Sequence, residues 1–213
     1  MTRTRKARPR VRVLVVDYGM GNLRSVAKAL EARGARLTVS SSPAAFARAD
    51  AVVLPGVGAF GEAIRRLRRG RLVAPLKRWI AADKPFLGIC LGYQLLFDRS
   101  TEFGSNRGLG CFPGRVVPFP RGLKVPHMGW NELAPRKRTW LLRGLPRRPY
   151  VYFVHSFFPV PKDRTVIAAE TAYGVRFAAA IERGRVAGVQ FHPEKSQRIG
   201  QTILRNFLAM ARR

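Results

Sequence analysis

Apolar residues follow two alternating spacings along the first ninety residues of the chain. Short β-branched runs, typical of buried strands, occur at 11–19, 36–40, 51–56 and 85–90. Between them, apolar residues recur at helical spacing over 22–33 and, despite Pro75, over 63–82, and a further helix is expected over 92–97. Strands that alternate with helices predict a mostly parallel sheet covered by helices on both faces.

Beyond Arg107 the pattern changes to short strands separated by Gly and Pro. These predicted strands span 114–119, 151–160, 165–170, 177–184 and 185–193. Their close spacing indicates antiparallel or mixed pairing, and a final amphipathic helix over 199–211 is expected to pack back on the sheet. No repeat or linker separates the two halves, so residues 11–213 are predicted to form one α/β domain preceded by a basic tail, residues 1–10.

Length and composition agree with this prediction. A chain of 213 residues with 46% hydrophobic content suits one compact domain with a substantial core. No apolar run approaches the ~20 residues that span a bilayer, and the N-terminal MTRTRKARPR lacks the apolar segment of a secretory signal. Two cysteines do not make a disulfide framework, so we expect a cytoplasmic protein with free thiols, Cys111 being structural.

The formal charge of +28 would ordinarily indicate a nucleic-acid ligand. However, the arginines are spread along nearly every segment, and only Arg3–Arg10 forms a dense basic run. The distribution therefore favours an Arg-rich solvated surface over a nucleic-acid site, with a tail that is expected to be disordered.

Cys90 stands between Gly88 and Gly92 in the run PFLGICLGYQLLF, at the junction of a predicted strand and helix. Flanking glycines permit a strained turn and a close approach of substrate, as in a nucleophile elbow. The N-terminus of the following helix lowers a thiol pKa and offers backbone N–H groups to an oxyanion. A buried structural cysteine would not need these glycines, so Cys90 is the candidate nucleophile.

A nucleophilic thiol needs a base, and the chain has three histidines. His192 is the best candidate, because it stands in VQFHPEKS, where strand alternation would place Glu194 on the same face to orient the imidazole. His127 and His155 have no carboxylate at such spacing and are expected to be structural or interfacial.

Two glycine-rich stretches lie at other predicted strand ends. In LPGVGAF, Gly56 and Gly58 could turn backbone N–H groups toward the active site as an oxyanion hole. The stretch DYGMGN lacks the third glycine of G-x-G-x-x-G, which argues against a dinucleotide site.

Taken together, GICLGYQLLF, FHPEKS, PGVGAF and DYGMGNLRSV resemble the class I, triad-type glutamine amidotransferases. With KVPHMGWN at 124–131, they are most similar to the glutaminase subunits of imidazole glycerol phosphate synthases of histidine biosynthesis. The resemblance covers Val11 to the C-terminus and implies a flavodoxin-like fold that hydrolyses glutamine to glutamate and ammonia. It also implies a heterodimer with a cyclase subunit that receives the ammonia, and neither a cofactor nor a metal.

The resemblance also implies roles for individual residues. Cys90 would form a thioester, His192 would shuttle the proton, and Glu194 would orient His192. The oxyanion would be held by the N–H groups of Val57 and Leu91. Glutamine would be bound by the remaining pocket residues, which are Gly56, Gly58, Gln94, Glu102, Ser156 and Phe157. The cyclase would be faced by Trp130, Tyr152 and Lys195.

One position departs from the family pattern, and two other functions stay open. The family often has Tyr after the Ser of VHS, whereas Phe157 has no hydroxyl to offer. The chain could instead be the glutaminase of an anthranilate, guanylate or pyridoxal phosphate synthase, although DYGMGN and PHMGWN weigh against this. A basic nucleic-acid-binding protein on the same fold is the alternative from a different class.

Overall fold

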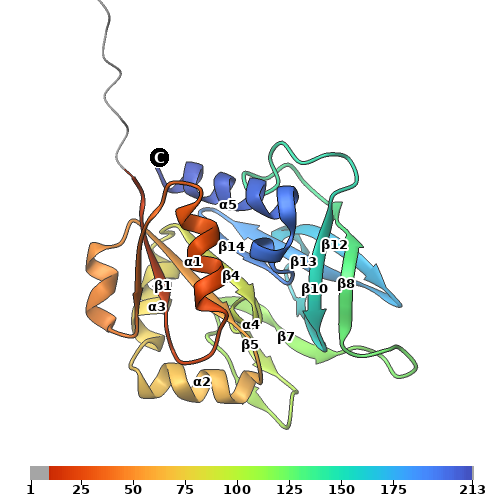
Figure 1. The fold of residues 1–213 in the computed structure, drawn as a ribbon. Helices are drawn as coiled ribbons and strands as arrows, with labels where there is room; N and C mark the ends of the chain where they lie inside the picture. The colour runs from red at the N-terminus through yellow and green to blue at the C-terminus, as the bar shows by residue number, and fades with distance from the viewer. Residues whose placement is uncertain (1–9, 213) are drawn as a thin grey trace, which may run out of the picture.

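The computed structural model describes residues 10–212, and an eight-stranded sheet forms its centre (Figure 1). The strand order is β2-β1-β3-β4-β14-β13-β12-β9. The strands β2, β1, β3, β4 and β14 pair in parallel, while β13, β12 and β9 continue the sheet in antiparallel pairing. Their bounds are β1 Arg12–Val16, β2 Arg36–Ser40, β3 Ala51–Gly56, β4 Phe86–Cys90, β9 Ala134–Pro135, β12 Ile167–Tyr173, β13 Val175–Arg183 and β14 Val186–Val189. The predicted mostly parallel sheet with an additional antiparallel region is confirmed.

Alternate residues of the buried strands pack on opposite faces of this sheet, as the two-residue period of a strand requires. In β1, Val13 and Val15 join the core beneath α1 (Leu23–Glu31) and α5 (Gln197–Ala211). Leu14 and Val16 join the core on the other face, under α2 (Phe60–Arg69) and α3 (Val73–Ala81). The central strands are therefore buried on both sides, which explains why the sequence reads as continuous apolar runs.

Two smaller sheets flank the central one. A two-stranded antiparallel sheet pairs β8 (His127–Glu132) with β10 (Tyr150–His155). A four-stranded sheet has the order β11-β7-β5-β6, with β5 Phe97–Ser100, β6 Asn106–Arg107, β7 Phe112–Pro118 and β11 Phe157–Pro161. Figure 1 shows β8 and β10 side by side, on the side of the molecule where β12 and β13 lie. The sequence did not predict β8, because its residues alternate less regularly between apolar and polar.

Two predicted helices differ from the structure. The helix over 63–82 is two helices, α2 and α3, because the chain turns at Arg71, whose φ is 55°. Pro75 is tolerated because it lies in the first turn of α3, where no intrahelical N–H donor is needed. The helix over 92–97 is only the short α4 (Leu91–Gln94), and β5 already begins at Phe97.

The predicted strands over 151–160 and 185–193 are also shorter than expected. The first is interrupted at Ser156, where the chain leaves β10 and enters β11 of a different sheet. The second ends with β14 at Val189 and is followed by the 3-10 helix η3 (Pro193–Lys195). Two further 3-10 helices, η1 (Pro43–Arg48) and η2 (Arg164–Val166), carry no periodic signal in the sequence.

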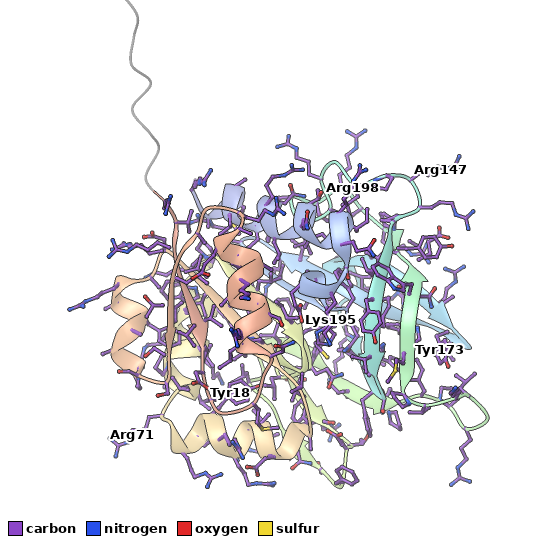
Figure 2. All side chains as sticks on the ribbon, in the orientation of Figure 1. Tyr18, Arg71, Arg147, Tyr173, Lys195 and Arg198 are labelled. Atoms are coloured by element: carbon purple, nitrogen blue, oxygen red, sulfur yellow. The ribbon has the colours of Figure 1, made fainter. Side chains whose placement is uncertain are left out.

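Basic side chains project on several sides of the molecule, as Arg71, Arg147 and Arg198 illustrate in Figure 2. The charge is thus spread over the surface and not gathered on one element. The predicted basic tail lies, apart from Arg10, outside the described residues. None of the helices within 10–212 has the length and apolar character needed to cross a membrane.

Candidate active site

Cys90 lies at a sharp turn between β4 and α4. Its backbone has φ 54° and ψ −111°, an unfavourable conformation for a residue with a side chain. A methyl group on Gly92 would overlap the backbone carbonyl of Leu54 in β3, so only glycine lets the turn sit this close to the sheet. In the parallel pairing of β3 with β4, Gly56 lies opposite Cys90. The predicted elbow is therefore present, and it places Cys90 beside the PGVG stretch.

His192 and Glu194 meet beyond the end of β14. The Nδ1 atom of His192 lies 2.8 Å from Glu194 Oε1. Strand alternation is the wrong explanation for this contact, because β14 ends at Val189 and Glu194 lies in η3. The turn is instead fixed by hydrogen bonds: His192 N donates to Tyr152 O at 2.9 Å, and Ser196 Oγ donates to His192 O at 2.6 Å.

The environment of His192 favours its protonated form. The side chains of His192 and Glu194 are 3% and 1% exposed. Burial alone lowers the pKa of His192, but the nearby Cys90 sulfur and the Glu194 carboxylate together raise that pKa to about 10. Within residues 10–212, His192 Nε2 has no hydrogen-bond partner. The arrangement suits an imidazolium that lies beside the Cys90 sulfur and can pass on its Nε2 proton.

A cavity of about 310 Å³ opens over Cys90. It brings together nine of the residues singled out in the sequence: Val57, Gly58, Cys90, Leu91, Gln94, Glu102, Ser156, Phe157 and His192. Glu194 lies behind His192, and Gly56 lies under the hydroxyl of Tyr18 without lining the cavity. The sequence reasoning missed Pro126, Val154 and His155 as lining residues. His155 carried a signal in its VHS context, but nothing in the sequence placed that strand over Cys90.

Polar side chains at the cavity are held by hydrogen bonds to the backbone and to the Gln190 side chain. Gln94 Nε2 donates to Phe157 O at 2.9 Å and to Gln190 Oε1 at 3.1 Å. Glu102 Oε2 accepts from Phe60 N at 2.6 Å, at the N-terminus of α2. Both protons of Gln94 Nε2 are thus used inside the protein, and its Oε1 remains as an acceptor for a ligand. One Glu102 oxygen likewise remains for a cationic group.

Trp130, Tyr152 and Lys195 lie together, but not in the cavity. The ring centroids of Trp130 and Tyr152 are 6.1 Å apart, and Lys195 Nζ lies 5.7 Å from the Tyr152 centroid. Trp130 is 47% exposed and the neighbouring Met128 on β8 is 61% exposed. We call these four residues the β8–β10 surface. Such exposed aromatic and Met side chains are typical of a protein interface.

Sequence comparisons show which known proteins this chain is similar to. The family model for glutamine amidotransferase class-I matches residues 14–211. The chain is 51% identical over 198 residues to the imidazole glycerol phosphate synthase subunit HisH of Aquifex aeolicus, covering 92% of this chain and 96% of that protein. It is 50% identical over 202 residues to the protein of the same name from Syntrophotalea carbinolica, covering 92% and 98%.

Solved structures with low sequence identity have a similar fold. The PurLQS structure from Thermotoga maritima matches with a TM-score of 0.75 at 18% identity, covering 94% of this chain and 99% of that chain. A glutamine amidotransferase structure from the same organism matches with a TM-score of 0.68 at 17% identity, covering 95% of this chain and 99% of that chain.

Proposed function

The chain belongs to the class-I glutamine amidotransferase family, and we propose that it is the glutaminase subunit of an imidazole glycerol phosphate synthase. The observation that carries the proposal is the cavity in which the Cys90 elbow faces His192, with Glu194 behind the imidazole at 2.8 Å. The identity of about 50% to subunits of that synthase, over more than nine-tenths of each chain, supports this synthase over others. The chain would act in the cytoplasm with residues 11–213 as one domain, and its two free cysteines agree with a reducing compartment.

The proposed reaction is hydrolysis of the side-chain amide of glutamine. The Cys90 thiolate attacks the amide carbon, and the N–H groups of Val57 and Leu91 stabilise the oxyanion. The protonated His192 gives its Nε2 proton to the leaving nitrogen, so the C–N bond breaks and ammonia leaves a thioester. His192 then takes a proton from water as the water attacks the thioester, which releases glutamate and restores the thiolate. Glu194 orients the imidazole and stabilises its charge.

Residues around the elbow have the chemistry to hold glutamine. Gln94 Oε1 can accept from the substrate, and the remaining oxygen of Glu102 can take its α-ammonium group. Gly58, Ser156 and Phe157 complete the lining of the pocket, whereas Gly56 lies outside the lining and opposite Cys90 in the pairing of β3 with β4. Phe157 contributes its backbone carbonyl, which accepts from Gln94, so no side-chain hydroxyl is required at this position for that contact.

Ammonia would pass to a cyclase subunit docked on the β8–β10 surface. Hydrolysis without the partner would waste glutamine, and free ammonia protonates in water. The glycines of the PGVG stretch allow the Val57 peptide to rotate, Gly58 having φ 91°. We propose that the glutaminase rate is regulated at this peptide. The Val57 N–H turns toward the oxyanion when the cyclase and its ligand are bound. One missing oxyanion donor reduces the rate by roughly 10²–10³.

Steady-state glutamine hydrolysis tests the assignment, measured for the purified chain alone, with saturating cyclase, and with the cyclase ligand as well. We expect a low rate for the isolated chain, a rise of about 10²–10³ in the full complex, and no hydrolysis by Cys90→Ser, whose complex still uses added ammonia. Full activity of the isolated chain would contradict regulation by the Val57 peptide and favour a free-standing glutaminase or another synthase. Near wild-type hydrolysis by Cys90→Ser would overturn the catalytic assignment.

A matched pair of surface variants tests the interface. Lys195→Ala removes the cation beside Tyr152, whereas Arg198→Ala removes an exposed cation three residues along the chain (Figure 2). Lys195→Ala is expected to weaken binding of the cyclase measured by titration calorimetry, and Arg198→Ala to leave it unchanged. Equal effects of both variants would indicate that only the overall charge matters.

A further inference from the structure

A chain of hydrogen bonds runs inward from strand β8 toward the elbow. Asn131 Nδ2 lies 3.2 Å from His127 Nε2, and His127 Nδ1 lies 3.0 Å from His155 Nε2. His155 Nδ1 lies 2.8 Å from Phe157 O. The two imidazoles are 3% and 6% exposed, so water does not replace these contacts.

The chain continues from the same carbonyl to the sulfur of Cys90. Phe157 O also accepts from Gln94 Nε2 at 2.9 Å, and Gln94 Nε2 donates to Gln190 Oε1 at 3.1 Å. Gln190 Nε2 then lies 3.8 Å from Cys90 Sγ. Gln190 is fully buried at the end of β14, and neither the sequence motifs nor the proposed mechanism gives it a role.

The donor and acceptor roles in the hydrogen bonds from Asn131 to Phe157 O are fixed by the groups at the two ends. Backbone carbonyls only accept, and Asn131 Nδ2 also donates to Ala172 O at 3.0 Å, so the amide nitrogen of Asn131 faces His127. His127 Nε2 therefore accepts, and its Nδ1 carries the proton that is donated to His155 Nε2. His155 Nδ1 carries the proton that is donated to Phe157 O. Each imidazole is neutral, with its proton on Nδ1.

The direction of the second half follows from the same carbonyl. Gln94 must turn its nitrogen toward Phe157 O, and the second proton of that nitrogen lies toward Gln190. Gln190 must then turn its oxygen toward Gln94 and its nitrogen toward Cys90. The hydrogen-bond network therefore fixes the orientation of the Gln190 amide, with its N–H group toward the sulfur.

We propose that the Gln190 amide N–H stabilises the Cys90 thiolate, and that the chain through Gln94 and Phe157 O back to His155 and His127 holds this donor in place. A hydrogen bond to a charged acceptor is stronger than one to a neutral acceptor, so the donor favours thiolate over thiol. In this role Gln190 contacts the reacting atom, whereas His155 and His127 are positioning residues. The proposal rests on Cys90 being the nucleophile of the proposed function, but its test does not depend on glutamine turnover.

The test measures the pH dependence of Cys90 alkylation by iodoacetamide in a Cys111→Ala background, which leaves one thiol. Gln190→Met keeps an unbranched side chain without a donor. The other titratable groups at the site are unchanged in this variant; they are His192, Glu194, Tyr18, His155 and Glu102. The alkylation midpoint is expected to rise by about one pH unit, a tenfold loss of thiolate below the midpoint. An unchanged midpoint in folded Gln190→Met overturns the proposal.

A measurement on the unmutated site keeps the test valid if Gln190→Met does not fold. With side-chain ¹⁵N-labelled glutamine, one amide proton resonance should shift with the same midpoint as alkylation in the Cys111→Ala protein. The same resonance should stay constant with pH in the Cys90→Ser protein. A spectrum in which no glutamine amide follows the thiol titration overturns the proposal.

The positioning role is tested at His155. His155→Asn can place an amide nitrogen near the position of Nδ1 and keep the donor to Phe157 O, whereas His155→Leu removes it. The midpoint is expected to rise in His155→Leu and to return toward the reference value in His155→Asn. Equal midpoints in both variants would contradict the role of His155. Glutamine turnover is recorded in parallel. If the Cys111→Ala protein does not hydrolyse glutamine but its alkylation midpoint depends on Gln190, the proposed function is refuted and this inference is not.

Discussion

Replacing His127 by Gln should make the free energy of unfolding depend less on pH between pH 7 and pH 5. The pKa of His127 is lowered from 6.5 to about 4, and that of His155 to about 3, in both cases first because burial penalises the charged imidazole. A folded pKa below the unfolded value means that the unfolded chain binds more protons. The stability contributed by each neutral histidine is therefore present above pH 6.5 and is lost as the pH falls toward the folded pKa.

The size of the loss follows from these values. At pH 5 an imidazole in the unfolded chain is almost fully protonated, whereas folded His127 is mostly neutral. Integrating the linkage relation from pH 7 to pH 5 gives a loss of roughly 2 kcal/mol in the free energy of unfolding for His127. The pKa of His192 is raised instead, so its contribution has the opposite sign: it is present below pH 6.5 and is lost as the pH rises toward 10. His192 is common to all variants and cancels in the comparison.

Urea unfolding at pH 5, 6, 7 and 8 tests this difference for the wild type and His127→Gln. The variant is expected to be less stable at pH 7, because it loses hydrogen bonds to Asn131 and His155, but the gap should narrow by about 2 kcal/mol at pH 5. The control is Phe153→Leu, which removes an aromatic ring stacked on His127 with centroids 4.9 Å apart and removes no titratable group. Its curve should run parallel to that of the wild type. A parallel curve for His127→Gln would refute the reasoning.

Four further substitutions test the triad, a buried hydroxyl and the elbow. His192→Ala should reduce glutamine turnover nearly as much as loss of the thiol, and Glu194→Gln should reduce it less, since the carboxylate only orients and stabilises; the reverse order in kcat would contradict these roles. Tyr18→Phe should raise the free energy of unfolding by about 1 kcal/mol, because its buried hydroxyl has no partner within residues 10–212; a fall in stability would show that the hydroxyl is satisfied. Gly92→Ala should lower it by about 3 kcal/mol or more, since the added methyl overlaps a β3 carbonyl, whereas Gly21→Ala meets only ordinary contacts; equal losses would argue against the elbow constraint.

The parts of the fold that were predictable are those in which local pattern and tertiary burial agree. The parallel strands β1, β3 and β4 are buried on both faces, so their apolar runs carry a strong signal, whereas β2 is a largely exposed edge strand. The long helix over 63–82 was wrong because apolar spacing continues across Arg71 even though the backbone turns there with φ 55°. Helical periodicity reports which residues face a core, and two consecutive helices on the same core can share that periodicity.

The site was predictable where the chemistry is local in sequence. The pairing of Glu194 with His192 is correct, but strand alternation is not its cause, since the contact depends on a 3-10 turn fixed by Ser196 and the backbone of Tyr152. Proximity of two residues in sequence was enough to suggest the pair and insufficient to give its geometry. The place of His155 in the cavity was not predictable, since a strand pattern does not tell which distant strand end a residue faces.

Gln190 illustrates why the remaining contacts were not predictable. Its approach to the sulfur depends on the parallel pairing of β14 with β4, in which Val189 lies opposite Ile89, so that the next residues along the chain are Gln190, just beyond β14, and Cys90. A register shift of one residue would turn the amide to the other face of the sheet and remove the donor. The helix-terminal and glycine signals around Cys90 are properties of one segment, whereas this contact is a property of two strands about a hundred residues apart. The environment of the nucleophile is therefore set as much by sheet register as by the elbow, and substitutions that loosen the β4–β14 pairing should affect thiol reactivity without touching the elbow itself.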